Sequence, residues 1–142
     1  MKSSIRKGDK KMLNLRYENV NPKHRKTGDC STRALCKTLG FEYDEVLRMQ
    51  FEMALKTKYA TSSKQVTERI LKEYGWVKMP QPRKANGRKY RVWEMDELLT
   101  KKQMQEGVLI SVANHNTCIK DGAVIDIWDC TDYTVGNYYI KE

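Results

Sequence analysis

The stretch "NHNTCIKDGAVIDIWD", residues 114–129, carries the strongest local signal in the chain. Its Asp-Gly pair at 121–122 separates two β-prone runs, and this dipeptide favours a two-residue type I′ turn because both central residues need positive φ. A turn of that length fixes the register of the two strands. We therefore predict a hairpin whose pairs run outward from the turn as Lys120 with Ala123, Ile119 with Val124, and Cys118 with Ile125.

The register of this hairpin decides which side chains share a face of the sheet. Successive strand residues point to opposite faces, so we expect His115 on the same face as Asp126 and Trp128. Asp126 is then a diagonal neighbour of His115, within reach of a hydrogen bond. Cys118 and Asp129 are expected on the other face, although a bulge would shift the register by one residue and bring Asp129 to the histidine instead.

Three helical patterns precede the hairpin. A helix is predicted from Asp29 or Ser31 to Leu39, where a glycine follows and ends it. Asp44 is expected to cap a second helix, "DEVLRMQFEMALKTKY", and the "TSS" at 61–63 is expected to cap a third. The inward-facing side chains are predicted to be Val46, Leu47, Phe51, Ala54 and Leu55 in the second helix, and Val66, Ile70, Leu71 and Tyr74 in the third.

Strand patterns dominate the second half of the chain. "GWVKM" at 75–79 reads as a short strand and "MDELLTKKQ" at 95–103 as a short helix. Further β-prone runs are "GVLISVAN" at 107–114, the two halves of the hairpin, and "NYYIK" at 137–141. Because helices come first and strands afterwards, we predict an α+β domain in which N-terminal helices pack on an antiparallel sheet.

Composition and charge are typical of one folded domain. The 142 residues are 39% hydrophobic and 32% charged, and we expect a basic, mobile arm at 1–13 followed by a single domain at 14–142. Nine basic and two acidic residues give 1–28 a net charge of +7, and six basic residues with no acid give 78–91 a net charge of +6. We read these segments as mainly solvated, with nucleic acid as a secondary partner.

No stretch of the sequence reads as a membrane or export signal. There is no apolar run of 18 residues, and the first residues lack the apolar segment of a secretory signal. We therefore expect no membrane partner and a cytoplasmic location.

The four cysteines are at positions 30, 36, 118 and 130, with spacings C-x5-C and C-x11-C. Neither spacing is the C-x2-C pair of a zinc site, and disulfides are rare in the cytoplasm, so we expect free thiols and no metal or cofactor. Cys36 and Cys118 are expected in the core. A zinc site made of Cys30, His115, Cys118 and Cys130 is a competing use of the same atoms, but Cys118 and His115 cannot both reach one ion from a regular strand.

A thiol opens the first predicted helix, in "TGDCSTRAL" at 27–35. The partial positive charge of a helix N-terminus favours thiolate over thiol. A histidine in hydrogen-bond reach can take the thiol proton, and a carboxylate on the other ring nitrogen fixes the tautomer. We predict a catalytic triad with Cys30 as nucleophile, His115 as base and Asp126 as orienting acid, with Asp129 as the alternate third member and Asp132 as a more distant one.

These two motifs also carry a family resemblance. "TGDCSTRAL" and "HNTCIKDGAVIDIWD" resemble motifs of papain-like cysteine peptidases, and most closely those of short phage- and bacterium-encoded peptidase-like proteins related to the double-glycine leader peptidases of bacteriocin exporters. The resemblance covers residues 19–130 and implies a papain-like fold with the same three catalytic residues. It implies a cysteine peptidase, or thiol hydrolase, that cleaves a peptide or isopeptide bond of a peptide or protein substrate through an acyl-enzyme. The location would be the host cytoplasm if the chain is phage-encoded.

The chain departs from the papain-like pattern just before the thiol. Those enzymes generally place a glutamine there to complete the oxyanion hole, whereas "NVNPKHRKTGDC" at 19–30 has none. Asn21 and Thr27 are the candidate replacement donors, and Asp29 is a further candidate for the oxyanion or substrate site. Loss of one such donor costs about 100- to 1000-fold in rate. The alternative is therefore a non-catalytic, basic phage-type protein that uses the peptidase scaffold to bind nucleic acid or a host protein.

Overall fold

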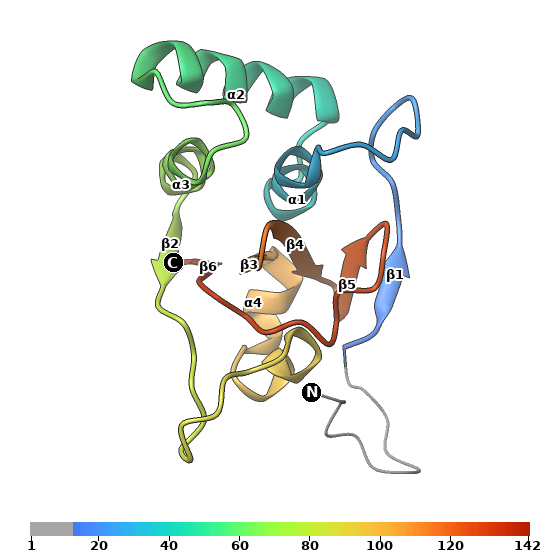
Figure 1. Cartoon of the computed structure of the whole chain (residues 1–142), viewed down its shortest axis with the longest axis vertical. Helices are drawn as coiled ribbons and strands as arrows, with labels where there is room; N and C mark the ends of the chain where they lie inside the picture. The colour runs from blue at the N-terminus through green and yellow to red at the C-terminus, as the bar shows by residue number, and fades with distance from the viewer. Residues whose placement is uncertain (1–12) are drawn as a thin grey trace.

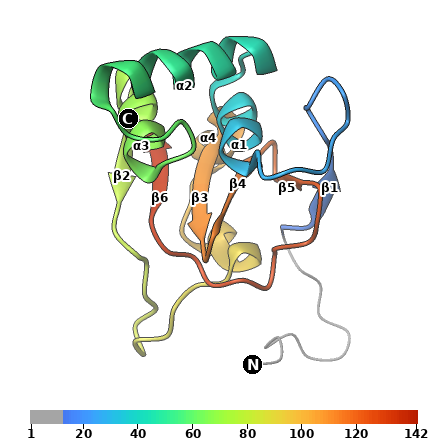
Figure 2. The ribbon, with the colours of Figure 1, turned by 45° about the horizontal axis from the view of Figure 1, so that its top comes forward.

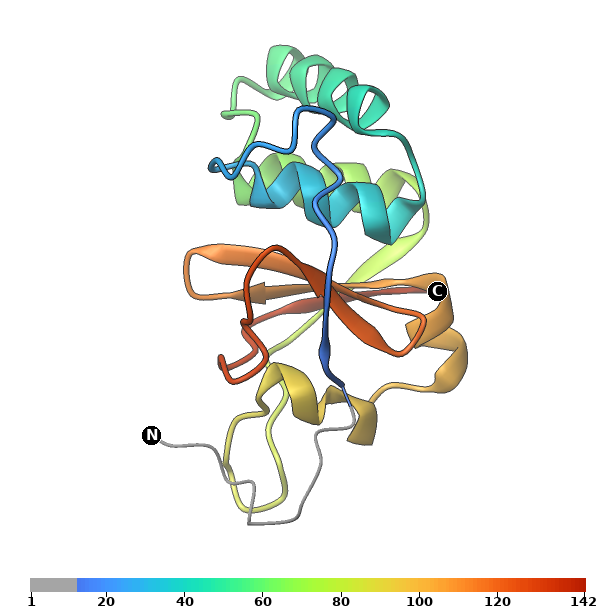
Figure 3. The same cartoon turned by 90° about the vertical axis from the view of Figure 1, so that its right-hand side faces the viewer.

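The computed structural model describes residues 13–142, which form an α+β fold built on one mixed sheet of six strands. Three α-helices cover one face of the sheet, and a 3-10 helix and a short α-helix cover the other (Figures 1 and 3). The first group is α1 (Cys30–Leu39), α2 (Tyr43–Thr57) and α3 (Lys64–Glu73), and the second is η1 (Val92–Glu97) and α4 (Lys101–Glu106). Within residues 13–142, no helix has the length and apolarity needed to cross a membrane.

The strands lie in the order β1-β5-β4-β3-β6-β2, which Figure 2 shows from right to left. Their bounds are Leu15–Tyr17 for β1, Trp76–Met79 for β2, Val108–Val112 for β3, His115–Lys120 for β4, Ala123–Asp126 for β5 and Tyr138–Lys141 for β6. All neighbours are antiparallel except β1, which is parallel to β5. The predicted all-antiparallel sheet is wrong at this edge because the three residues of β1 are too few to show an alternating pattern.

The hairpin register is confirmed. Asp121 and Gly122 have φ values of 53° and 75°, as a type I′ turn requires, and the three predicted pairs beside the turn are present. The second strand is shorter than predicted and ends at Asp126. There the backbone N–H of Ile127 donates to Oδ1 of Asp126 at 2.7 Å, so this amide is not used in the strand ladder.

The two faces of the sheet have separate apolar cores. Alternation along β3 divides them, since Leu109 points toward α1–α3 while its neighbours point toward η1. The helical core contains Ala34, Leu35, Cys36, Val46, Met53, Val66, Ile70, Leu71, Trp76, Leu109 and Tyr139. The opposite core contains Leu13, Val92, Met95, Leu99, Val108, Ile110, Val112, Ile119, Val124, Cys130, Val135 and Tyr138. The sheet therefore holds the start of α1 over the first residues of β4.

The predicted limits of α1 are confirmed. The helix runs from Cys30 to Leu39, and Gly40 adopts the left-handed conformation with φ 77°. Its N–H donates to the carbonyl of Cys36 at 2.8 Å, which closes the helix. The cap of α3 is confirmed as well, because the Ser63 hydroxyl accepts from the N–H of Val66.

The predicted inner face of α2 is confirmed at Val46 and wrong at Phe51 and Leu55. The N-cap is Glu42, two residues before the expected cap Asp44, and it forms a capping box with Glu45. The buried residues of the helix are Val46, Gln50 and Met53. Phe51 and Leu55 are 56% and 70% exposed. The buried Gln50 accepts a hydrogen bond from the Thr32 hydroxyl at 2.7 Å. This polar contact with α1 sets which face of α2 points inward. A hydrophobic pattern gives no hint of it.

Smaller corrections concern the second half and the N-terminus. The predicted helix at 95–103 is interrupted, because Thr100 and Gln103 form a capping box that starts α4 afresh. Tyr74 is exposed, contrary to prediction. Leu13 is buried, so the domain begins earlier than predicted, and the rest of the predicted arm lies outside the described residues.

The glycine before β3 provides a test of how α1 is seated on the sheet. Gly107 has φ +107°, and a Cβ there would lie 2.9 Å from the carbonyl oxygen of Thr38. We expect Gly107→Ala to lower the free energy of unfolding by about 2–4 kcal/mol through strain and overpacking. Gly87→Ala is the control, since its φ is +85° but nothing lies within 4 Å, and it should cost about 1 kcal/mol. Urea unfolding followed by circular dichroism measures both, and equal losses would contradict the close approach.

Candidate active site

The start of α1, at Cys30, and the start of β4, at His115, lie on the same side of the molecule, on the left in Figure 3. The Cys30 thiol lies near the His115 ring and the backbone N–H of Asn116, and both lower the pKa of the thiol. The Asn116 side chain donates to the hydroxyl of Ser31 at 2.9 Å. The start of the helix and the start of the strand are thus tied together by neighbouring residues on each side.

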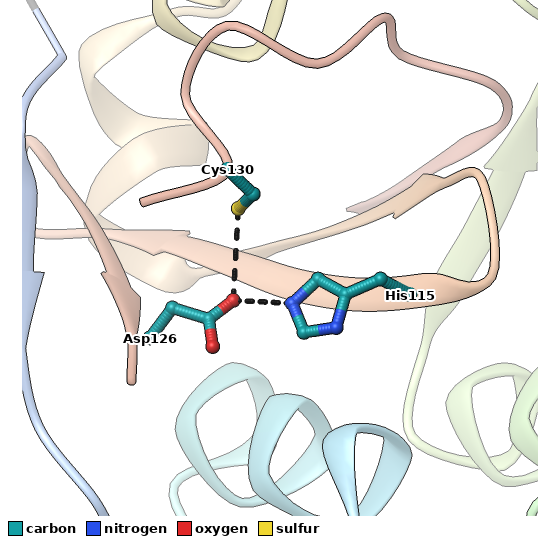
Figure 4. Close-up of side chains that lie close together, drawn as sticks. All are labelled: His115, Asp126 and Cys130. Carbon is teal, nitrogen blue, oxygen red and sulfur yellow. Dashed lines mark hydrogen bonds and ion pairs between the residues drawn. The ribbon is translucent and has the colours of Figure 1, made fainter. Parts of the chain in front are cut away.

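The imidazole has a carboxylate on its other side, as Figure 4 shows. Nε2 of His115 lies 2.6 Å from Oδ2 of Asp126, and both side chains are buried. A carboxylate can only accept, so Nε2 carries the proton. The two nitrogens of the ring point in different directions, which leaves Nδ1 for the thiol of Cys30.

The buried carboxylate of Asp126 has several further partners. It accepts hydrogen bonds from the N–H of Ile127 and from the thiol of Cys130, whose Sγ lies 3.6 Å from Oδ2 (Figure 4). Nη2 of Arg33 lies 3.7 Å from Oδ1. Arg33 is itself buried and forms an ion pair with Asp29, at the start of α1. Paired charges therefore hold the acid in its ionised form.

These contacts set the pKa of the thiol. Burial alone would raise the pKa of Cys30, but the hydrogen bond with His115, the N–H of Asn116 and the charges of His115 and Arg33 outweigh it, so the pKa lies below its ordinary value. The pKa values of Cys36 and Cys118 move the other way, to about 12 and about 11, chiefly because burial disfavours a thiolate. The confirmed burial of Cys36 and Cys118 makes Cys30 the thiol suited to nucleophilic chemistry.

The pKa values of the two partners move in the matching directions. Burial would lower the pKa of His115, but its bonds to Asp126, Cys130 and Cys30 raise it to about 11. Burial would raise the pKa of Asp126, but its bond to His115 lowers it. The arrangement therefore favours a thiolate, an imidazolium and a carboxylate side by side.

The start of α1 lacks the usual side-chain cap. Asp29 occupies the N-cap position, but its carboxylate makes no capping bond. It accepts instead from Arg33, from Asn21 at 3.0 Å and from the Tyr43 hydroxyl at 2.9 Å. The first N–H groups of a helix have no partner within the helix, so those beside Cys30 remain able to bind a negative charge.

A cavity of about 520 Å³ opens beside the thiol and the imidazole. Its walls come from the starts of α1 and α3 and from the turn between β3 and β4. The lining residues are Gly28, Cys30, Ser31, Ser62, Lys64, Thr67, Ser111, Val112, Asn114, His115, Asn116 and Tyr139. A second hollow, of about 610 Å³ between α2 and α3, is lined by neither cysteine nor histidine.

The other predicted site residues have different surroundings. Asp126, and not Asp129, lies against the imidazole; Oδ1 of Asp129 accepts from the N–H and hydroxyl of Thr131 at 2.9 and 2.6 Å. Asn21 and Thr27 do not line the cavity. The Asn21 amide donates to Asp29 and to Tyr43, and the carbonyl of Thr27 accepts from Arg33. Asn21 and Thr27 therefore stabilise the start of α1 through Asp29 and Arg33, away from the cavity.

Three further residues lie near Cys30, His115 and Asp126. The sequence predicted no role for Arg33 and Cys130, and for Trp128 only the face of the sheet. Arg33 lies four residues after Asp29, and this helical spacing of opposite charges was a usable signal. Cys130 follows an irregular loop and had no signal of its own. Trp128 was predicted on the His115 face, and its ring lies 4.5 Å from the imidazole and against Tyr133.

The structure does not bring together the four residues of the competing zinc site, but it does group three other possible metal ligands. Cys118 lies on the opposite face of β4, whereas His115, Asp126 and Cys130 have ligand atoms within 4.8 Å of one another. Two ligands of one tetrahedral zinc at about 2.1 Å are about 3.4 Å apart. The 2.6 Å between Nε2 of His115 and Oδ2 of Asp126 is a hydrogen-bond distance, so a proton fits this gap and a zinc ion does not.

Comparisons with protein-family models, curated proteins and solved structures found no match to this chain.

Replacing the imidazole tests its effect on the thiol. In His115→Ala the interaction and charge that lower the pKa of Cys30 are lost while burial remains, so that pKa should rise. The pH dependence of Cys30 alkylation by iodoacetamide, read by peptide mass spectrometry, should shift to higher pH. His24→Ala removes the other histidine, which is exposed, and should leave the curve unchanged. Overlapping curves for His115→Ala and the parent would refute the pairing.

Removing the buried guanidinium tests the charge network. Arg33→Met leaves the carboxylates of Asp29 and Asp126 without their cation, which should cost about 3–5 kcal/mol of unfolding free energy. Lys37 is on the same helix as Arg33 and forms a more exposed ion pair with Glu18. Lys37→Met breaks this pair and should cost less than about 1 kcal/mol of unfolding free energy. Urea denaturation compares the two variants, and similar small losses would show that Arg33 does not stabilise these acids.

Proposed function

We propose that this protein is a cysteine peptidase, or a related thiol hydrolase, of papain-like fold. Cys30 is the nucleophile, His115 the general acid and base, and Asp126 the acid that orients the ring. The observation that carries the proposal is the buried imidazole, which lies 2.6 Å from a buried carboxylate and close enough to the thiol of Cys30 to lower its pKa.

The reaction follows from the charges of these three groups. The Cys30 thiolate attacks the carbonyl carbon of an amide, and the carbonyl electron pair moves onto oxygen. Collapse of this intermediate expels the amine, which takes a proton from the His115 imidazolium, and leaves a thioester. The neutral imidazole then removes a proton from water, which attacks the thioester, and the acid product and the thiol are released.

The oxyanion would be stabilised by groups different from the glutamine of papain-like enzymes. The uncapped N–H groups of Cys30 and Ser31 are candidates, because the carboxylate of Asp29 is held away from them by Arg33. The amide side chains that line the cavity belong to Asn114 and Asn116. These replace Asn21 and Thr27 as the proposed donors.

Two further observations support a hydrolase over a non-catalytic scaffold. The chain order matches the papain-like resemblance, with a thiol at the start of the first helix and histidine and aspartate on later strands. In the basic segment 78–91, Lys84 binds Glu94 at 2.5 Å and Lys78 binds Glu68 at 3.0 Å. Part of the positive charge that suggested nucleic acid is therefore neutralised within the fold.

Peptide hydrolysis tests the proposal directly. The reduced protein is incubated with a proteome-derived peptide library, and new peptide ends are read by mass spectrometry. We expect cleavage that falls by at least about 1000-fold in Cys30→Ala. Cys36→Ala, which removes a buried thiol of the same helix, should retain it. Cleavage that persists in Cys30→Ala, or a parent protein that neither cleaves any peptide nor forms a thioester with it, would contradict the assignment.

A further inference from the structure

The wall of the cavity carries a net positive charge, because the imidazolium of His115 offsets the thiolate of Cys30 and Lys64 adds a second cation. Within the described part of the chain, its lining contains Lys64 and His115 as basic residues and no carboxylate. The remaining lining residues are mainly small, with hydroxyl or amide groups. A cavity with this lining attracts an anionic group and repels a cationic one.

The ammonium group of Lys64 is only weakly paired within the protein, so it is able to bind an anionic ligand. Its side chain is 57% exposed, and Nζ lies 3.4 Å from Oδ1 of Asn137 and 3.9 Å from Oε2 of Glu68. The same carboxylate of Glu68 has two closer partners, the Tyr139 hydroxyl at 2.6 Å and Nζ of Lys78 at 3.0 Å. Glu68 is therefore engaged mainly by these groups, and Lys64 is compensated only at a distance.

The approach to the cavity carries further positive charge. The segment at 22–28, which leads into Cys30, is exposed and includes Lys23, Arg25 and Lys26 but no acid. Gly28 at its end lines the cavity. Figure 3 shows this segment on the same side as the turn between β3 and β4. A negatively charged substrate would thus be attracted before it reaches the thiol.

One polar group on the cavity wall lacks a partner. Thr67 of α3 lines the cavity, and its buried hydroxyl makes no hydrogen bond within the described residues. A buried donor without an acceptor is unfavourable. A ligand oxygen that reached this wall after a small side-chain movement would satisfy it.

We propose that the thiol site selects an acidic peptide, with a carboxylate close to the scissile bond bound by Lys64. This inference rests on the proposed function and names its substrate class. Asp129 and Asp132 do not line the cavity, so no acid in its wall opposes such a substrate. Lys64 acts as a specificity-determining residue and takes no part in the bond-breaking steps.

Two small alkylating reagents measure this selectivity without a known substrate. Iodoacetate and iodoacetamide have nearly the same size and the same leaving group, but only iodoacetate is negatively charged. The rate constants for alkylation of Cys30 are measured by peptide mass spectrometry, and their ratio reports the charge preference. We expect the iodoacetate-to-iodoacetamide ratio to fall about threefold or more in Lys64→Gln, the effect of losing one nearby charge.

Two variants control for effects other than charge at this place. Lys72→Gln makes the same charge change on the same helix, away from the thiol cavity, and should change the ratio by less than about 1.5-fold. Lys64→Arg keeps the charge and should keep the ratio. The iodoacetamide rate of each variant shows whether its thiol site is intact.

Each outcome has a distinct meaning. A ratio unchanged in Lys64→Gln, or lowered equally in Lys72→Gln, overturns the inference and leaves the proposed hydrolase in place. A fall of the iodoacetate-to-iodoacetamide ratio in Lys64→Arg also overturns the inference, because this variant keeps the positive charge. Failure of Cys30 to react with iodoacetamide in the parent protein overturns the proposed function, and with it the substrate class.

Discussion

The hydrogen bond between Nε2 of His115 and Oδ2 of Asp126 depends on a turn of two residues. Asp121 and Gly122, with positive φ, allow β4 and β5 to pair without an offset, and a slip of one residue would move one of the two side chains to the other face. The same register places Asn116 toward α1, where its side chain donates to Ser31 and its backbone N–H lowers the pKa of Cys30. A local turn therefore positions groups more than 80 residues apart in the chain.

The buried charges around this bond alternate in sign. Asp29 pairs with Arg33, Arg33 approaches Asp126, Asp126 binds His115, and His115 lies near the thiol of Cys30 and lowers its pKa. The two ends of this series are consecutive residues at the start of α1, so the series closes on itself. Each charge is stabilised by a neighbour of opposite sign, which is the condition under which burial of several ions is tolerated. Because the carboxylate of Asp29 pairs with Arg33, it does not cap the first N–H groups of α1, which lie beside the sulfur of Cys30.

Local signals in the sequence were sufficient for much of this arrangement. The Asp-Gly turn predicted the hairpin register, and the glycine after Leu39 predicted the end of α1. The hairpin register alone gave the grouping of Asp126 with His115, while the contact to Cys30 came from chemical and family reasoning. Contacts between distant segments could not be predicted: the edge strand β1 has three residues, and Gln50 orients α2 through Thr32. Cys130 reaches Asp126 through an irregular loop whose path leaves no periodic pattern.

The coupling between the sulfur and the imidazole is the claim on which the account depends. It is measured most directly by nitrogen-15 nuclear magnetic resonance of the His115 ring during a pH titration of the reduced protein and of Cys30→Ala. The account predicts an imidazolium that persists well above neutral pH in the parent, because bonds to Asp126, Cys130 and Cys30 raise the pKa of the ring, and that deprotonates at lower pH when the sulfur is absent. Identical titrations of His115 in the two proteins, or a ring already neutral at pH 7 in the parent, would contradict it.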